Sequence, residues 1–355
     1  MEDSSKEFLR SILLTPSPTG FEERVQAVVR ARMEGIADTI ETDVHGNVIA
    51  CLNPTAKRKI MFAGHCDQIG FMVKHISKEG FVTFAALGGI DAGVCPGAHV
   101  VIYGEKGAVA GIFGRKPIHA QLPDERANFK IDLDKMWIDI GATGQKDAEK
   151  RIKVGDFATF RLEVSELSKD FITAPGLDDK AGLFIVMEAL RLLKREKLNV
   201  GVYAVSTVQE EVGLRGARTA AYSIDPEVGI AVDVTHASDN PGSDSPRAVP
   251  CKLAAGPAIV SGPNINPQVL KLLTSAAKKG KIKYQNAPSA GVLGNDANSI
   301  QISRSGVAAG SIGVPNRYMH TQVEVCSYAD LQACAKLLAA FVKEIKPNTS
   351  FIPMA

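Results

Sequence analysis

The sequence lacks a strong charge bias, CxxC cysteine pairs and long apolar runs. Its formal net charge is only +2, which disfavours nucleic acid or an anionic membrane surface as a partner. No apolar stretch approaches the roughly 20 residues of a membrane span, and the acidic, polar start MEDSSKEF does not predict a signal peptide. Six cysteines without CxxC spacing favour free thiols in a reducing compartment over disulfides or a thiolate zinc site. We therefore expect a cytoplasmic protein.

The chain does contain enough apolar sequence for a large core. With 355 residues and 45% hydrophobic content, it is expected to form about two domains. Residues 71–160 consist of short β segments punctuated by glycine, whereas helix and strand patterns alternate before and after them. The predicted helices lie near residues 8–13, 22–33, 179–195, 215–222, 267–279 and 328–345. This order predicts an α/β domain that is interrupted by an inserted β domain.

Five segments place histidines or carboxylates at or near the ends of predicted strands. The residues are His65 and Asp67 in GHCDQIG, Asp178 in GLDDKAG, Glu210 and Glu211 in VQEEVG, Asp233 in VDVTH, and His320 in RYMHT. Runs such as KIMFAG and VGIAVD are typical of buried parallel strands. Side chains at the ends of such strands converge at one edge of a sheet. The set therefore predicts a two-metal site.

Each of these residues also has a simpler structural interpretation. A single histidine after an apolar strand, such as His65, is more often a packed or surface residue than a ligand. Asp67 changes this balance, because a carboxylate two residues later can accept the second ring proton and fix the imidazole tautomer. Asp178 could be a helix N-cap. That interpretation does not explain Gly176 and Gly182, which suit a close approach of the backbone to a bound ion.

The adjacent carboxylates Glu210 and Glu211 are the sharpest local signal. Neighbouring carboxylates repel each other and raise each other's pKa unless a cation is present, so the pair is either exposed to solvent or binds metal. Exposure is a poor explanation directly after the apolar run VYAVSTVQ. Asp233 could cap a turn and His320 could be a loop residue, but the five motifs in this order favour a metal site.

The order and the residues of these motifs resemble those of the glutamyl aminopeptidase family of dinuclear metallo-aminopeptidases. That family includes tetrahedral TET-type enzymes and is related to the zinc exopeptidases. The resemblance covers essentially the whole chain and includes KPIHAQ, VQEEVGLRGA and NRYMHTQVEV. It implies a zinc-exopeptidase-like α/β catalytic domain, with a mixed sheet flanked by helices, in residues 1–70 and 165–355. A small β-barrel-like domain for dimerisation and substrate access would occupy residues 71–164. One departure is Gly294-Asn295-Asp296, where Gly-Thr-Asp is expected.

The resemblance also implies roles for individual residues. Two ligand sets would share one carboxylate: His65, Asp178 and Asp233 for one metal, and Asp178, Glu211 and His320 for the other. Glu210 would be the general base, and Asp67 would orient His65. His119 is either a surface loop residue or a contact for the substrate or the oxyanion. His236 is not expected to be a ligand.

The implied function is a metal-dependent aminopeptidase that removes N-terminal residues from short peptides. Mixed histidine and carboxylate ligands suit two divalent ions of zinc or cobalt and are also compatible with manganese. The resemblance further implies that the inserted domains pair subunits into dimers, and that the dimers assemble into a dodecamer.

Two other functions would use parts of the same sequence. A metal-dependent deacylase or carboxypeptidase of the same clan would add an arginine-rich pocket, for which Arg304 and Arg317 are candidates. An endoglucanase-like glycoside hydrolase would use paired carboxylates, but the adjacent Glu210 and Glu211 cannot easily straddle a glycosidic bond. A non-catalytic scaffold is disfavoured, because all the predicted ligands and the base are present.

Overall fold

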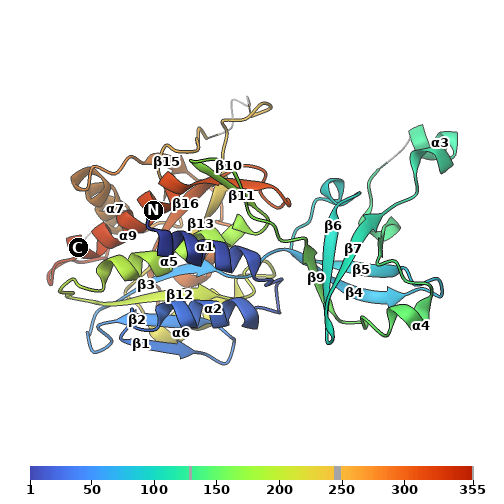
Figure 1. Cartoon of the computed structure of the whole chain (residues 1–355). Coiled ribbons are helices and arrows are strands. Elements are labelled where there is room, and N and C mark those ends of the chain that lie inside the picture. The colour runs from blue at the N-terminus through green and yellow to red at the C-terminus, as the bar shows by residue number, and fades with distance from the viewer. Residues whose placement is uncertain (128–129, 244–248, 354–355) are drawn as a thin grey trace.

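A mixed sheet of eight strands forms the centre of the larger part of the molecule (Figure 1). The computed structural model describes residues 1–127, 130–243 and 249–353. The strands, in their order across the sheet, are β1 (Thr39–Thr42), β2 (Val48–Leu52), β12 (Gly201–Thr207), β3 (Lys59–His65), β13 (Val228–His236), β16 (Ala308–Asn316), β14 (Ala258–Ser261) and β15 (Gln285–Pro288). The central strands β12, β3, β13 and β16 are parallel, whereas β2 and β14 join them antiparallel. The predicted α/β fold with a mixed sheet is confirmed.

Helices cover both faces of this sheet because its central strands are apolar on both sides. In β3, Ile60 and Phe62 belong to one core, while Met61 and Ala63 belong to the core of the opposite face. The first core includes residues of α1 (Asp3–Leu14), α2 (Glu23–Met33), α5 (Leu177–Leu193), α7 (Pro267–Lys279) and α9 (Tyr328–Glu344). The second includes residues of α6 (Arg215–Ile224) and α8 (Asp296–Gln301). Full burial of a side chain such as Phe62 stabilises the fold by about 2 kcal/mol.

A closed barrel of six strands stands beside the sheet domain (Figure 1). Its strands are β4 (Gly70–Ile76), β5 (Val82–Leu87), β6 (His99–Gly104), β7 (Gly107–Gly114), β8 (Trp137–Asp139) and β9 (Phe157–Phe160). Phe71, Phe84, Phe113 and Phe160 pack in its interior, with ring centroids of the contacting pairs 4.7 to 5.9 Å apart. A small β barrel with its own core therefore interrupts the α/β fold, as predicted.

The remaining elements are short. β10 (Ser165–Ser168), β11 (Phe171–Ala174) and β17 (Glu324–Ser327) form a sheet of three strands. The inserted region also carries the helices α3 (Pro123–Ala127) and α4 (Gln145–Ala148). Among the described helices, none is both long and apolar enough to cross a membrane. All six cysteines are buried free thiols.

Candidate active site

The predicted strand ends converge at one edge of the large sheet. β12, β3 and β13 are neighbouring parallel strands. His65 is the last residue of β3, Glu210 follows the end of β12, and Asp233 lies in the last part of β13. Asp178 is at the start of α5, and His320 lies in the loop between β16 and β17. The fold therefore brings together residues from widely separated parts of the chain.

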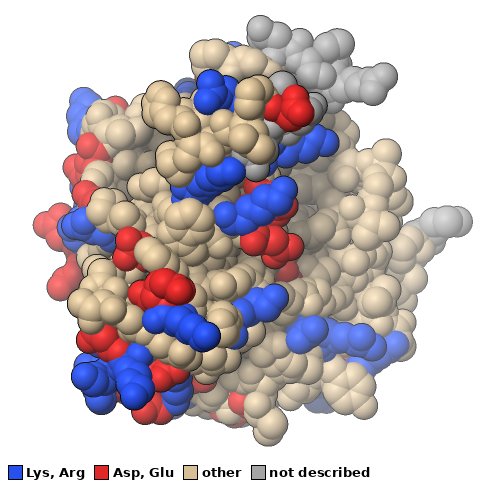
Figure 2. Space-filling view, turned by 90° about the vertical axis from the view of Figure 1, so that its right-hand side faces the viewer, with Lys and Arg blue, Asp and Glu red and all other residues tan. Residues whose placement is uncertain are grey.

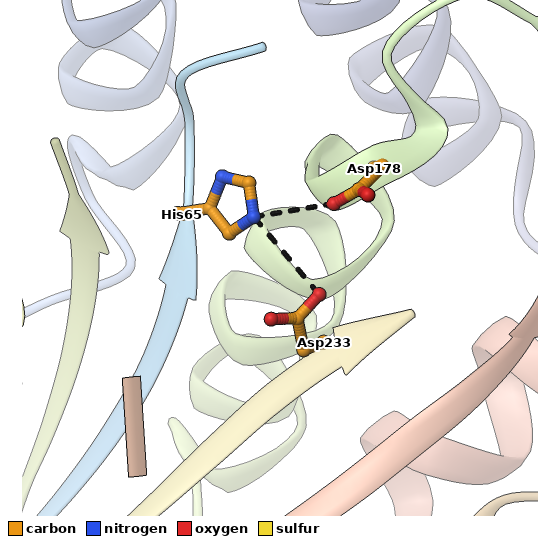
Figure 3. Close-up of side chains that lie close together, drawn as sticks. All are labelled: His65, Asp178 and Asp233. Carbon is orange, nitrogen blue, oxygen red and sulfur yellow. Dashed lines mark ion pairs between the residues drawn. The ribbon is translucent and has the colours of Figure 1, made fainter. Parts of the chain in front are cut away.

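Two groups of side chains share the carboxylate of Asp178. In the first group, the candidate ligand atoms of His65, Asp178 and Asp233 lie within 4.8 Å of one another. His65 Nε2 is 3.2 Å from Asp178 Oδ1 and 3.9 Å from Asp233 Oδ1 (Figure 3). In the second group, His320 Nε2 is 3.1 Å from Asp178 Oδ2 and 3.5 Å from Glu211 Oε1. Each oxygen of Asp178 thus faces a different imidazole.

The donor atoms of both groups fit divalent metal ions. His65 Nδ1 is 3.0 Å from the backbone carbonyl oxygen of Asp67. A carbonyl oxygen can only accept, so in the neutral ring Nδ1 carries the proton and Nε2 presents its lone pair to the first group. In the second group, Oε1 of Glu211 is buried without a hydrogen-bond partner. A bound cation would offset the free-energy cost of burying that oxygen without a hydrogen bond.

The electrostatics of the cluster also favour a cation. Burial raises the pKa of Glu210 to about 10, an effect that His65 opposes and Asp233 reinforces. Burial, and then the charge of Asp178, raise the pKa of Glu211 to about 7. Carboxylates held this closely are stable in their ionised form only when positive charge is added.

Glu210 lies beside the first group but belongs to neither. Its Oε2 is 3.8 Å from His65 Nε2, and the residue is 8% exposed. The backbone N–H groups of Glu210 and Glu211 donate to the two oxygens of Asp67, at 3.0 and 3.3 Å. The Thr19 hydroxyl also donates to Asp67, at 2.8 Å. Asp67 therefore holds the backbone of the glutamate pair in place.

The contact between Asp67 and His65 differs in one detail from the sequence prediction. The carboxylate of Asp67 was the expected acceptor for the ring proton, but it lies 3.5 Å from Nδ1. The backbone carbonyl of the same residue is closer, at 3.0 Å. Asp67 thus orients the imidazole through its main chain, because its carboxylate is engaged by the backbone of the glutamate pair.

Two glycines permit close packing around the cluster. A Cβ at Gly182 would lie 2.2 Å from Asp179 Oδ2 and 2.5 Å from the carbonyl oxygen of Val232. Gly182 is therefore required because α5 packs closely against β13 and the carboxylate of Asp179. The approach of the backbone to a bound ion, which the sequence suggested, is not the reason. Gly88, with a φ of +81°, follows β5 of the barrel, and a Cβ there would lie 3.2 Å from Glu211 Oε2. The inserted barrel thus reaches the cluster directly.

Two buried carboxylates that the sequence prediction missed support the cluster. Glu324 accepts hydrogen bonds from the backbone N–H groups of Asp178 and His320, at 2.7 and 2.9 Å. Asp179 accepts one from the backbone N–H of His65, at 3.2 Å. Asp179 adjoins Asp178, and Glu324 lies within the NRYMHTQVEV motif. The sequence marks Asp179 and Glu324 by these positions in the motifs. A position in a motif does not distinguish a carboxylate that supports the site from one at the surface.

Two other histidines, His119 and His236, lie outside the groups. His119 is exposed on the short 3-10 helix η2 (Ile118–Ala120) of the inserted region. His236 is exposed at the end of β13. Neither belongs to a ligand group among the described residues.

The two candidate arginines for a carboxylate pocket are engaged elsewhere. Arg317 forms an ion pair with Asp239 at 2.7 Å. Arg304 lies 3.5 Å from Asp225 and stacks over the ring of Tyr222. These contacts do not support a carboxypeptidase-type pocket around either residue.

The chain is similar to known proteins along nearly its whole length. The family described as M42 glutamyl aminopeptidase matches residues 46–337. The lysyl aminopeptidase of Pyrococcus furiosus is 37% identical over 343 residues, which cover 96% of this chain and 97% of the relative. A solved TET aminopeptidase from a marine sediment Thaumarchaeota archaeon superposes with a TM-score of 0.93 at 35% identity and 97% coverage of both chains. The TET1 peptidase of Pyrococcus horikoshii superposes with a TM-score of 0.85 at 32% identity, and the match covers 96% of this chain and 100% of the TET1 chain. That peptidase can assemble into a tetrahedron or a large octahedral shell.

Proposed function

The chain belongs to the M42 family of glutamyl aminopeptidases, and from this premise we propose that the two groups around Asp178 form the active site of a metal-dependent aminopeptidase acting on short peptides. The family and the relatives indicate that the protein is a hydrolase of peptide bonds. This disfavours the alternative function of a glycoside hydrolase. The observation that carries the proposal is the shared carboxylate, whose oxygens lie 3.2 Å from His65 and 3.1 Å from His320.

We propose two metal positions. His65, Asp178 and Asp233 would hold one divalent ion, and Asp178, Glu211 and His320 would hold the other. Imidazole and carboxylate ligands suit zinc or cobalt and also accommodate manganese. When bound, such ions lower the pKa of a water molecule and polarise the scissile carbonyl group.

In this proposal Glu210 is the general base. It accepts the proton of the attacking water and passes it to the leaving amine. Its position supports this role, because it lies 3.8 Å from His65 Nε2 and is in neither ligand group. Asp67 keeps Glu210 in place through the backbone hydrogen bond of 3.0 Å. We further propose His119, exposed on the inserted region, as a contact for the substrate or the oxyanion.

A free α-amine on the substrate is expected to be required, because the acidic cluster attracts a cationic terminus. The test compares one short peptide with a free and with an acetylated amino terminus, each with and without a chelator. We expect acetylation to stop cleavage, and we expect added zinc or cobalt to restore the activity that the chelator removes. A soluble cellulose derivative serves as a negative control. Equal rates on free and blocked peptides would contradict the aminopeptidase proposal and favour a deacylase or an endopeptidase.

The inserted region is proposed to pair subunits. Ile112, Ile118 and Val154 of this region are 46%, 50% and 60% exposed, and an interface between subunits would bury such apolar side chains. The face shown in Figure 2 carries interspersed acidic and basic side chains next to broad uncharged areas. We propose that dimers formed in this way assemble into a dodecamer, and a related TET1 peptidase that was solved as a dodecamer supports this.

Light scattering is expected to show a particle of about twelve chains of 37.8 kDa each, which dissociates towards dimers when metal is stripped. Ile118→Asp should weaken the assembly, because it places a charge in the proposed interface. A substitution on the catalytic domain, Leu14→Asp at a residue 41% exposed, is the matched control. A fully active monomer at micromolar concentration would contradict the assembly and leave the active-site proposal intact.

We also propose that the enzyme is cytoplasmic. Its six cysteines are buried free thiols, and such thiols are typical of proteins in a reducing compartment.

A further inference from the structure

The segment that joins α1 to α2, residues 15–22, packs against the chain just after the end of β3. The buried hydroxyl of Ser17 donates to the backbone carbonyl oxygen of Cys66, at 2.7 Å. The backbone N–H of Thr19, which is also buried, donates to the carbonyl oxygen of Gln68, at 3.2 Å. The segment is therefore fixed beside the strand end that carries the first histidine of the cluster.

The last residue of this segment, Glu22, is a buried carboxylate that reaches the chain just before the glutamate pair. It is 6% exposed. Its Oε1 accepts hydrogen bonds from the backbone N–H groups of Gly20, at 2.7 Å, and Gln209, at 3.2 Å. Gln209 precedes Glu210 and has a φ of +54°, in the left-handed region that costs free energy for a residue with a side chain. The hydrogen bond to Glu22 thus stabilises a strained residue next to Glu210.

Three consecutive backbone N–H groups in this turn donate to two carboxylates. The N–H of Gln209 donates to Glu22. The next two, of Glu210 and Glu211, donate to Asp67. Because peptide units are planar, holding three successive units fixes the Cα atom of Glu210 and the direction of its side chain. Glu22 and Asp67 therefore hold the turn together, from two separate parts of the chain.

The turn needs the acceptor oxygen of Glu22 more than its charge. Both N–H groups reach the same oxygen, Oε1, and an amide side chain offers an acceptor oxygen in the same place. Burial, and then the charge of Asp67, raise the pKa of Glu22 to about 7, so a neutral side chain suits this position. Glutamine should therefore hold the turn, whereas a side chain without an acceptor oxygen would leave buried N–H groups unpaired.

We propose that Glu22 is a positioning residue for the general base: it holds the backbone of Gln209 so that the carboxylate of Glu210 points into the cluster. The inference rests on the proposed role of Glu210 and adds a residue from the N-terminal part of the chain. Glu22 belongs to neither ligand group among the described residues. Its loss is therefore expected to misplace the base without removing a metal.

Glu22→Met tests the inference, because methionine keeps the length of the side chain but lacks the acceptor oxygen. We expect kcat for a free dipeptide to fall at least about tenfold, since misplacement of a reacting group by about 1 Å costs up to about 10² in rate. Metal content is expected to match the wild type, and KM to change by less than about threefold. Loss of metal in the folded variant would overturn the inference.

Two further variants serve as matched comparisons. Glu22→Gln restores the acceptor oxygen and is expected to recover most of the kcat that Glu22→Met loses. Glu23→Met makes the same substitution one residue later, at an exposed position of α2, and is expected to keep the wild-type kcat. An equal kcat in Glu22→Met and Glu23→Met, or a loss in Glu22→Gln as large as in Glu22→Met, would overturn the inference.

A double variant separates positioning of the base from general damage. Glu22→Met combined with Glu210→Gln is expected to be no more than about twofold slower than Glu210→Gln alone, because the misplaced group has already lost its function. A further loss of about tenfold in the double variant would overturn the inference. A wild-type kcat in Glu210→Gln alone would instead contradict the proposed role of Glu210.

Hydrogen exchange gives a readout that does not depend on catalysis and decides the inference in that last case. Mass spectrometry is expected to show faster exchange of residues 206–214 in Glu22→Met than in Glu22→Gln, because the N–H of Gln209 has lost its acceptor. Equal exchange in the two folded variants would overturn the inference. If Glu22→Met does not fold, Glu22→Asp replaces it, with the same results expected, because its carboxylate is one methylene too short to reach both N–H groups.

Discussion

Glu210→Gln is expected to lower kcat by at least about 10² while the bound metal stays at the wild-type level. The amide keeps the shape of the side chain but does not accept a proton from water at neutral pH. Glu210 is in neither ligand group, and its backbone hydrogen bond to Asp67 is unaffected by the substitution. Steady-state kinetics on a free dipeptide, together with elemental analysis of the purified variant, measure both quantities.

Glu211→Gln is the matched control for this experiment, because it makes the same chemical change one residue away. Glu211 Oε1 lies 3.5 Å from His320 Nε2 in the second ligand group. Its loss is expected to lower metal content, and added metal should recover part of the activity. If Glu210→Gln lost metal while Glu211→Gln kept it and lost only kcat, the roles within the pair would be reversed.

Asp178→Asn is expected to abolish activity and to lower metal occupancy at both positions. The physical reason is that each carboxylate oxygen faces a different group, Oδ1 towards His65 and Oδ2 towards His320. An amide offers only one oxygen and no negative charge to two cations. Elemental analysis and isothermal titration with zinc or cobalt provide the measurement.

Asp233→Asn is the control for the shared carboxylate, because Asp233 belongs to the first group alone. We expect this variant to lose affinity at one position and to keep the other. Two fully occupied metals in Asp178→Asn would show that its carboxylate is not shared. Loss of both metals in Asp233→Asn would show that the two positions depend on each other in another way.

Much of the fold follows from local sequence patterns. The helix predicted for residues 267–279 is α7 (Pro267–Lys279), and the one predicted for 328–345 is α9 (Tyr328–Glu344). Helical periodicity and apolar strand runs are properties of neighbouring residues, so one sequence reveals them. The short helix α8 (Asp296–Gln301) was not predicted, because six residues span too few turns to show a period.

The sequence by itself predicted that the two histidines and the carboxylates at the strand ends lie together, and the tertiary structure decided their distances and the residues that support them. His65 and Asp233 could be grouped in advance because both lie at the ends of apolar strands, and such ends share one edge of a parallel sheet. The distances depend on strand order, which places β3 between β12 and β13 although β12 follows it by more than a hundred residues. Only that packing showed that Glu324 supports Asp178 and that Asp179 accepts a hydrogen bond from the backbone of His65. Supporting hydrogen bonds of this kind join segments that are distant in the chain, so no local sequence pattern records them.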